Sequence, residues 1–279
     1  MDVHDVVDEA ALQDDELLTV LLDEEGFSAG RTRAIRPREM TADPPLSFAQ
    51  QRLWFLDQLV PGEPFYNLAS ALCLSGKLEV AALERSFSEI TRRHETLRTT
   101  FHPIESRPVQ VIAPATPLTL PVVDLSRLPE TERDVAAVRL AQEEARRPFD
   151  LARGPLLRAT LLRLGAEEHV LLLTLHHIAS DDWSKGVLNR ELAALYEAYA
   201  VGRPSPLPEP AIQYADFAVW QRERLRGEAL EAQLAYWKRQ LAGLPELDLP
   251  AARDHPSRAS AAIGTRCCCP RPCPRRSRR

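Results

Sequence analysis

The most prominent pattern along the chain is an apolar run that ends at two histidines. Val170–Leu175 is apolar on both faces, which is typical of a strand in the interior of a sheet, and His176 and His177 follow it directly. Before it, apolar and polar residues alternate over Leu157–Leu161, and Gly165–Glu168 has the composition of a turn. The pattern therefore predicts a hairpin whose second strand lies centrally and carries the histidine pair at its end.

The rest of the chain predicts helices that alternate with strands. Helices are expected at Asp14–Glu25, Leu46–Leu59, Leu78–Arg98, Glu130–Arg147, Trp183–Ala200 and Ala215–Leu244, and further strands at Phe65–Gly76, Thr99–Phe101 and Pro108–Ala113. The last helix is expected to be anchored by Trp220, Leu234, Trp237 and Leu241. Such an alternation around a central sheet predicts an α/β fold, a mixed sandwich of helices and strands.

One further histidine falls on a predicted helix. His94 shares the apolar face of Leu78–Arg98 with Leu83, Phe87 and Ile90. On such a face a histidine more often has a structural than a catalytic role, because a buried polar group is normally hydrogen-bonded within the core. We therefore expect His94 to be a buried, hydrogen-bonded structural residue.

Composition limits the functional classes. A chain of 279 residues with 44% hydrophobic content is long enough for one large or two ordinary domains. Its net charge of −5 implies no general affinity for nucleic acid or anionic membranes. The apolar run Leu17–Leu22 is too short to span a membrane, and the acidic start lacks the basic region of a secretory signal, so a cytoplasmic location is expected. Only Cys73 of five cysteines lies in the body, so disulfides are not expected in the main fold.

The histidine pair is the candidate site. Successive side chains of a strand point to opposite faces, so one of His176 and His177 can face the interior while the other faces a cleft. Histidine titrates near neutral pH, which suits it to accept a proton from an attacking amine or hydroxyl. Asp181, one loop later, can fix an imidazole or pair with an arginine. Taken alone, such a pair is more typical of structural histidines than of a catalytic site.

The motif HHIASDDWS resembles the HHxxxDG signature of condensation domains of nonribosomal peptide synthetases, which chloramphenicol-acetyltransferase-like acyltransferases share. Four other stretches resemble conserved blocks of that family in the same order, namely Leu46–Leu56, Arg92–Phe101, Pro148–Arg158 and Tyr214–Gln221. The resemblance implies a chloramphenicol-acetyltransferase-like mixed-sheet sandwich, of which only the N-terminal lobe is present, at residues 46–250. Residues 1–45 are then an N-terminal helix and linker and a candidate docking segment, and residues 251–279 a disordered tail.

The resemblance also implies an activity. Condensation domains join two carrier-bound thioesters by forming an amide bond, and both substrates arrive on phosphopantetheine arms. The implied partners are peptidyl carrier domains and other synthetase modules, with no directly bound cofactor, no metal, no nucleic acid and no membrane. By the same resemblance, His177 takes part in the reaction as general base or by positioning the amine. His176 and Asp181 are then structural members of the site, with Asp181 paired to an arginine.

The chain departs from the family pattern at Asp182, where the signature has glycine. Aspartate tolerates unusual backbone angles and is a good helix N-cap, so the fold is expected to survive. A carboxylate near His177 is expected to favour the protonated imidazole, and its side chain to obstruct a pantetheine arm. Both effects predict weakened activity.

A second departure is the C-terminal tail. After Pro250 nothing resembles the second lobe, and the tail contains Cys267, Cys268, Cys269 and Cys273 among arginines and prolines. A zinc site is disfavoured by the cysteine spacing, and an arginine-rich tail that binds nucleic acid or membrane is an alternative. We favour an out-of-frame end of a GC-rich gene, and thus a truncated synthetase fragment.

Two functional hypotheses follow from the truncation. The first is a condensation-type acyltransferase that is weak or inactive without a second lobe. The second is a non-catalytic fragment that acts at most as a docking or interaction module. Epimerisation domains and a free-standing trimeric acetyltransferase are lesser alternatives, whereas heterocyclisation domains are disfavoured because they replace the histidine pair with aspartates. A lobe without its partner is also expected to expose apolar surface.

Overall fold

The computed structural model describes residues 34–39, 43–105 and 107–244. The chain divides into two units, Met1–Arg36 and Pro37–Arg279, and every element described below belongs to the second. The predicted helix Asp14–Glu25 and the tail 251–279 lie outside the described residues. Nothing in the structure therefore tests the docking segment or the origin of the tail.

The centre of the fold is a four-stranded mixed sheet with the order β1-β6-β5-β4. Its strands are β1 (Asn67–Ser75), β4 (Val122–Asp124), β5 (Leu157–Arg163) and β6 (Glu168–His176). Strand β6 pairs antiparallel with both β1 and β5, whereas β4 pairs parallel with β5. The prediction of a central strand that ends at the histidine pair is therefore confirmed.

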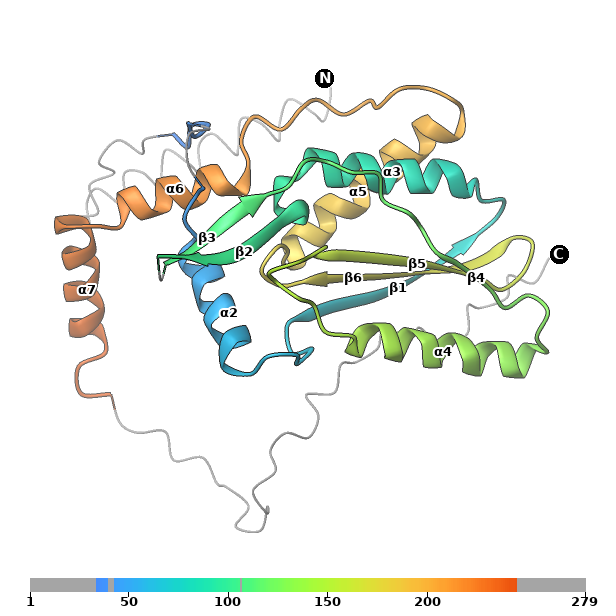
Figure 1. Ribbon diagram of the computed structural model, residues 1–279, viewed down its shortest axis with the longest axis horizontal. Helices are drawn as coiled ribbons and strands as arrows, with labels where there is room; N and C mark the ends of the chain where they lie inside the picture. The colour runs from blue at the N-terminus through green and yellow to red at the C-terminus, as the bar shows by residue number, and fades with distance from the viewer. Residues whose placement is uncertain (1–33, 40–42, 106, 245–279) are drawn as a thin grey trace, which may run out of the picture. The chain divides into compact units, whose positions relative to one another are not determined.

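Helices cover both faces of this sheet (Figure 1). Helices α3 (Val80–Arg93) and α5 (Asp182–Ala200) pack with Leu171, Leu173 and Leu175 of β6 in the main core. Leu172 points to the opposite face, where it packs with Ala141 of helix α4 (Glu130–Arg146). Successive residues of β6 thus pack alternately against the helices on the two faces of the sheet, which explains why the strand is apolar on both faces.

A smaller core beside the main sheet supports the end of β6. Strands β2 (Thr99–Ile104) and β3 (Arg107–Ile112) form an antiparallel pair, and helix α2 (Phe48–Leu59) lies next to them. Leu53 of α2, Phe101 of β2 and Ile178, which follows β6, are buried in one cluster. This cluster packs directly behind the histidine pair.

Two predicted helices differ from the structure. The helix predicted at Leu78–Arg98 ends at Arg93, because His94 takes extended backbone angles (φ −104°, ψ 98°) and a short 3₁₀ helix, η1 (Glu95–Arg98), follows. The helix predicted at Ala215–Leu244 is two helices, α6 (Tyr214–Arg224) and α7 (Glu228–Gln240). Gly227 lies between them with φ of 57°, a backbone conformation that residues other than glycine rarely adopt.

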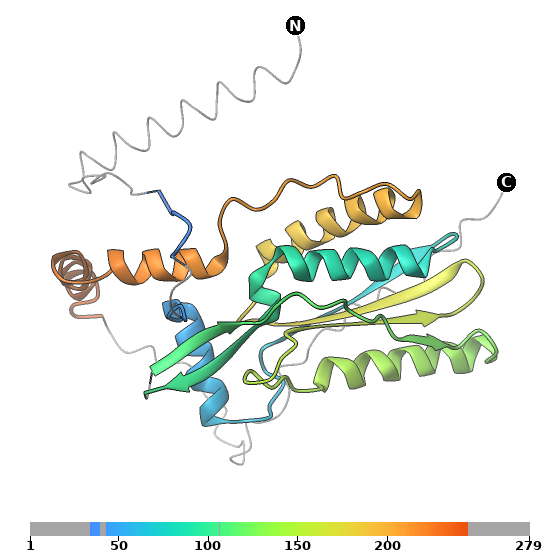
Figure 2. The same cartoon turned by 45° about the horizontal axis from the view of Figure 1, so that its top comes forward.

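The anchoring role predicted for the last helix is wrong for α7. Leu234, Trp237 and Leu241 are 48%, 55% and 54% exposed, and no residue of α7 is buried. In Figure 2, α7 lies beyond α6 and away from the four-stranded sheet. The sequence period identified an apolar face correctly, but a period does not reveal whether that face has a partner. Exposed apolar surface of this kind is what we expected of a lobe without its second half.

Candidate active site at the end of strand β6

The backbone of neighbouring segments orients the histidine pair from both sides. The N–H of His176 donates to the carbonyl of Leu156 at 3.1 Å, and the N–H of His177 donates to the carbonyl of Tyr66 at 2.8 Å. These bonds extend the ladder beyond β6, so the two rings leave the strand on opposite faces. His176 is 4% exposed, whereas His177 is exposed.

His176 is enclosed by aromatic side chains. The ring of Phe149 lies edge-on at 5.8 Å and that of Tyr66 at 6.3 Å between centroids. Nδ1 of His176 accepts the backbone N–H of Ile178 at 3.0 Å, which requires an unprotonated Nδ1. Burial, together with the nearby charges of His177 and Arg158, lowers the pKa of His176 to about 4. This imidazole is therefore neutral at physiological pH and has a structural position.

The tautomer of His177 follows from its hydrogen bond. Nδ1 lies 2.8 Å from the carbonyl oxygen of Ser180, which can only accept, so Nδ1 carries the proton and donates it. The neutral ring then has its lone pair on Nε2. A lone pair on an exposed ring nitrogen can accept a proton or a hydrogen bond from a bound amine.

Asp181 caps helix α5. Its Oδ1 accepts hydrogen bonds from the backbone N–H of Ser184 at 2.8 Å and from the Ser184 hydroxyl at 2.6 Å. These bonds, and the nearby His177, lower the pKa of the Asp181 carboxyl. The arginine partner expected for Asp181 is not found within the described part of the chain. The N-terminus of α5 stabilises the Asp181 carboxylate instead.

Asp182 is the first residue of α5 and not its cap, contrary to expectation. Its carboxylate is 94% exposed and forms an ion pair with Lys185 at 3.0 Å. Positive φ angles among the described non-glycine residues occur only at Glu105, so position 182 does not require glycine. The side chain is not among those that line the pocket described next.

Beside His177 lies a pocket of about 440 Å³. Its wall is mainly apolar, and the polar groups in it include His177, His94, Asp181 and Arg52. The remaining lining comes from Ala49, Leu53, Tyr66, Thr96, Leu97, Leu175, Ile178–Ser180, Trp183, Ser184, Val187, Leu188 and Ile212–Tyr214. A cavity of this size, in which polar side chains converge on a wall of mainly apolar area, has the character of a small-molecule site.

The structure brings most of the family-like stretches to this pocket. The stretch Leu46–Leu56 contributes Leu53, Arg92–Phe101 contributes Leu97, and Tyr214–Gln221 contributes Tyr214. The stretch Pro148–Arg158 does not line the pocket but supplies Phe149 against His176. Trp183, within the histidine motif, and Tyr66 also line the pocket, and no sequence pattern distinguished the position of Tyr66.

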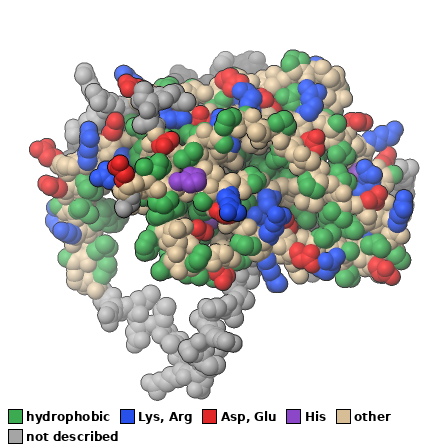
Figure 3. Space-filling view, in the orientation of Figure 1, with side chains coloured by type: hydrophobic (Ala, Val, Ile, Leu, Met, Phe, Trp, Pro, Cys, Tyr) green, Lys and Arg blue, Asp and Glu red, His purple; other side chains and the backbone are tan. Residues whose placement is uncertain are grey.

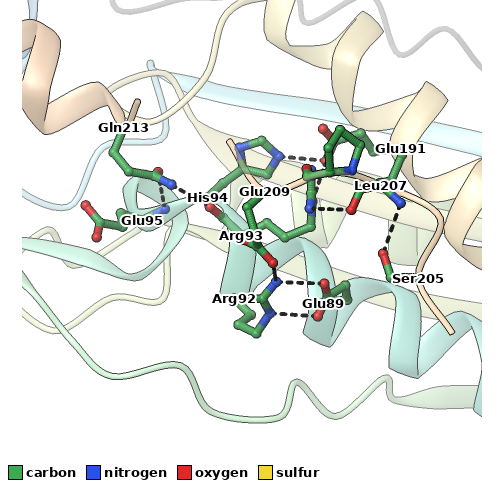
Figure 4. Close-up of polar contacts among 11 residues, drawn as sticks. Glu89, Arg92, Arg93, His94, Glu95, Glu191, Ser205, Leu207, Glu209 and Gln213 are labelled. Atoms are coloured by element: carbon green, nitrogen blue, oxygen red, sulfur yellow. Dashed lines mark hydrogen bonds and ion pairs between the residues drawn. The ribbon is translucent and has the colours of Figure 1, made fainter. Parts of the chain in front are cut away.

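The expectation of a buried His94 is wrong. The side chain is 29% exposed and lines the same pocket as His177, because the helix ends just before it and the chain turns away from the core. The expected hydrogen bond is present, since Nε2 lies 2.7 Å from Oε2 of Glu191 on α5. Figure 4 shows this pair within a polar network that joins α3, α5 and the segment before α6.

Three further features of the described residues are the distribution of charged side chains, the grouping of metal-ligand side chains and the apolar length of the helices. On the face seen in Figure 3, basic and acidic side chains are interspersed among hydrophobic ones. Across the described ranges, no group of three or more His, Cys, Asp or Glu side chains is placed to hold a metal ion. None of the helices described is both long and apolar enough to cross a membrane.

The sequence matches the condensation domain family over residues 40–265, and the chain belongs to that family. It is 54% identical over 214 residues to a linear gramicidin synthase of Brevibacillus parabrevis, and the match covers 76% of this chain and 3% of that protein. It is 46% identical over 217 residues to phosphinothricin tripeptide synthetase PhsC of Streptomyces viridochromogenes, covering 77% of this chain and 20% of that protein. The chain thus spans a small fraction of the length of these relatives.

Solved structures show the same fold. The X-domain in a complex with OxyB from teicoplanin biosynthesis is 37% identical with a TM-score of 0.70, and the match covers 80% of this chain and 49% of that one. The first condensation domain of the CDA synthetase is 27% identical with a TM-score of 0.64, covering 74% of this chain and 52% of that one. The chain therefore matches about half the length of these solved chains, and the expected fold is confirmed.

Proposed function

We propose that this chain is the histidine-bearing half of a nonribosomal peptide synthetase condensation domain, and that the complete domain forms an amide between two carrier-bound thioesters. The observation that carries the proposal is the exposed His177 in the pocket, with its lone pair on Nε2. The family membership and the synthetase relatives support the same reaction.

The chemistry fits the residues present. The amine of the acceptor attacks the thioester carbon of the donor, a C–N bond forms, the C–S bond breaks, and the amine proton leaves as the thiol is released. Nε2 of His177 can take that proton or hold the amine, whereas His176 stays neutral and buried and Asp181 fixes the start of α5. General-base assistance contributes roughly 10²–10⁴-fold. Alignment can contribute effective molarities of about 10⁵–10⁸ M, so positioning dominates.

The substrates are proposed to arrive on phosphopantetheine arms of carrier domains, and no directly bound cofactor is needed. The mainly apolar wall of the pocket suits an aliphatic or aromatic acceptor side chain. Arg52 is the one Lys or Arg side chain among the lining residues, and it suits the phosphate of an arm. Because alignment needs both walls of a channel, we expect the chain alone to be weakly active or inactive.

The test is turnover with two loaded carrier domains. We would incubate the chain with a donor and an acceptor thioester, alone and with the purified second half of a condensation domain from the linear gramicidin synthase named above. Intact-protein mass spectrometry would follow the transfer. Amide product that requires the added half and is lost in His177→Asn supports the proposal. Equal product from the His177→Asn variant contradicts it.

An interaction module is the second candidate. The X-domain to which this chain is 37% identical is described in a complex with OxyB, so a related fold serves in a protein complex. Absence of turnover in the presence of the second half, combined with measurable binding to a synthetase module, would favour this function.

A further inference from the structure

Two imidazoles from different parts of the chain line one pocket. His177 comes from the end of β6, and His94 comes from the junction between α3 and η1, more than eighty positions earlier in the chain. The function proposed above uses only His177. The second ring therefore needs an explanation of its own.

His94 is held through a single ring nitrogen. Its Nε2 lies 2.7 Å from Oε2 of Glu191, and no hydrogen bond within the described residues involves its Nδ1. The same carboxylate oxygen lies 3.5 Å from Nε of Arg93, whose side chain is buried and also donates to the carbonyl oxygen of Pro208 at 2.8 Å. Glu191 is thus fixed on one side by the helix α5 that carries it and on the other by a buried guanidinium (Figure 4).

This arrangement determines which ring nitrogen of His94 carries the proton when the imidazole is neutral. Burial acts to raise the pKa of Glu191, but its hydrogen bonds with His94 and Arg93 outweigh it and lower that pKa below its ordinary value. An ionised carboxylate can only accept, so in the neutral imidazole the proton lies on Nε2 and the lone pair on Nδ1. Nδ1 is then a hydrogen-bond acceptor without a protein partner in the described structure.

His177 also has one unprotonated ring nitrogen, but it is the other one. The carbonyl of Ser180 holds its proton on Nδ1 and leaves the acceptor on Nε2. The pocket is therefore lined by two imidazoles whose acceptor nitrogens are set by two different partners, on a wall whose exposed area is mainly apolar. A ligand with more than one N–H donor, such as a primary amine next to an amide, suits such a pair.

We propose that His94 is a positioning residue, which accepts a hydrogen bond from an N–H of the aminoacyl acceptor while Glu191 holds its tautomer. The inference rests on the proposed function for the identity of the ligand, but it concerns binding and does not require turnover. Arg93 and Glu191 then support the site indirectly, since they act on the ring and not on the ligand.

The test compares two hydrolysis-resistant probes with the full chain at pH 8, which favours neutral imidazoles. The first is leucyl-aminopantetheine, in which an amide replaces the thioester. The second is its 4-methylpentanoyl counterpart, which lacks only the amine. The measured quantity is the ratio of their dissociation constants by calorimetry. We expect the wild-type chain to prefer the amine by about fivefold to tenfold, which is the size of one net hydrogen bond.

Two substitutions separate binding from structure. In His94→Asn the side-chain amide lies near the position of Nδ1, and the contact with Glu191 is lost. In His94→Gln the longer side chain can contact Glu191, and the acceptor at the position of Nδ1 is lost. We expect His94→Asn to keep most of the preference and His94→Gln to reduce the ratio to near one. A preference retained in His94→Gln and lost in His94→Asn would overturn the proposal and assign His94 a structural role. Failure of both probes to bind the wild-type chain would also overturn it.

A second measurement needs no ligand. Nitrogen-15 shifts of the imidazoles, assigned with the His94→Asn and His177→Asn variants, distinguish a protonated from an unprotonated Nδ1. We expect His94 and His177 to show opposite tautomers. Identical tautomers would overturn the proposal, whatever the turnover experiment shows. Conversely, opposite tautomers and a retained amine preference with no turnover would leave this inference standing and count against the proposed reaction alone.

Discussion

His176 and His177 are neighbours in the chain, yet they differ in burial and in the role of Nδ1 in its hydrogen bond. The ring of His176 is sealed behind Phe149 with its Nδ1 bound to a backbone N–H, whereas the ring of His177 lines an open pocket with its Nδ1 bound to a carbonyl. One hydrogen-bond partner accepts and the other donates, so the two neutral rings have opposite tautomers. The end of β6 thus places a structural and a candidate reactive imidazole side by side.

The pKa of His176 predicts a pH-dependent stability. Its value of about 4 in the folded state lies below the ordinary 6.5, so the unfolded chain binds the proton first as pH falls. Its contribution is fully present above pH 6.5 and is lost as pH falls toward 4, by a total of about 3 kcal/mol. We expect urea unfolding between pH 7 and pH 4 to show this loss, and His176→Gln to flatten it.

His169 is the necessary control for this experiment. Burial and the charge of Arg163 lower the pKa of His169 as well, so part of the pH dependence belongs to it. His169→Gln should remove only that smaller part and leave the larger part in place. A pH profile unchanged in His176→Gln would mean that the ring is not sealed from solvent as described.

His177 should matter for reaction and not for folding. The side chain is exposed and its ring is hydrogen-bonded to the carbonyl of Ser180 alone among the described residues, so His177→Asn is expected to change the free energy of unfolding by less than about 1 kcal/mol. When the chain is complemented with the purified second half of a condensation domain (the complemented domain), we expect His177→Asn to lower the rate of amide formation by about 10²–10⁴-fold. Single-turnover kinetics would measure this rate. A loss of stability matching the loss of rate would argue for a structural role instead.

The sequence predicted the sheet better than the surroundings of the site. The run Val170–Leu175 identified an interior strand, and its period of two predicted that His176 and His177 face opposite sides, whereas the family resemblance assigned the reactive role to His177. The position of His94 could not be predicted, because the helical period says which face is apolar but not where the helix stops. The same limit explains the exposed α7, since Trp237 looks like an anchor in any helical projection.

Asp181 is expected to contribute to stability as a helix cap. Asp181→Ala removes the acceptor for the N–H and hydroxyl of Ser184 and should cost about 1 kcal/mol. Asp181→Asn is the matched control, because asparagine also caps helices and should restore most of that loss. Thermal unfolding of the three proteins at pH 7 provides the comparison. Equal destabilisation by both substitutions would show that the charge matters more than the cap.

The exposed position of Asp182 revises the expectation of weakened activity, and we now expect its effect to be small. Its carboxylate points into solvent and pairs with Lys185, and it does not line the pocket. Asp182→Asn should change the free energy of unfolding by no more than about 0.5 kcal/mol. Asp182→Gly should leave the rate of amide formation in the complemented domain nearly unchanged. A large gain of rate with glycine, but not with asparagine, would show that the backbone at this position limits the reaction.

A buried arginine outside the signature should prove more important than either aspartate. Arg38 lies in a stretch that the sequence presented as a linker, yet its guanidinium contacts Glu95 and Asp216 at 2.8 Å each. Asp216 is itself buried and accepts the backbone N–H of Gln213, a residue that lines the pocket. Arg38→Met removes the guanidinium from both carboxylates and leaves the buried Asp216 with backbone N–H donors alone, so we expect a loss of about 3 kcal/mol and weaker binding of leucyl-aminopantetheine. Urea unfolding and calorimetry would measure the two effects.

The double variant Arg38→Met/Asp216→Asn should recover part of the stability, because it removes the uncompensated buried charge. If the double variant is as unstable as the sum of its two single variants, the cost comes from lost packing of the arginine stem and not from the unpaired carboxylate.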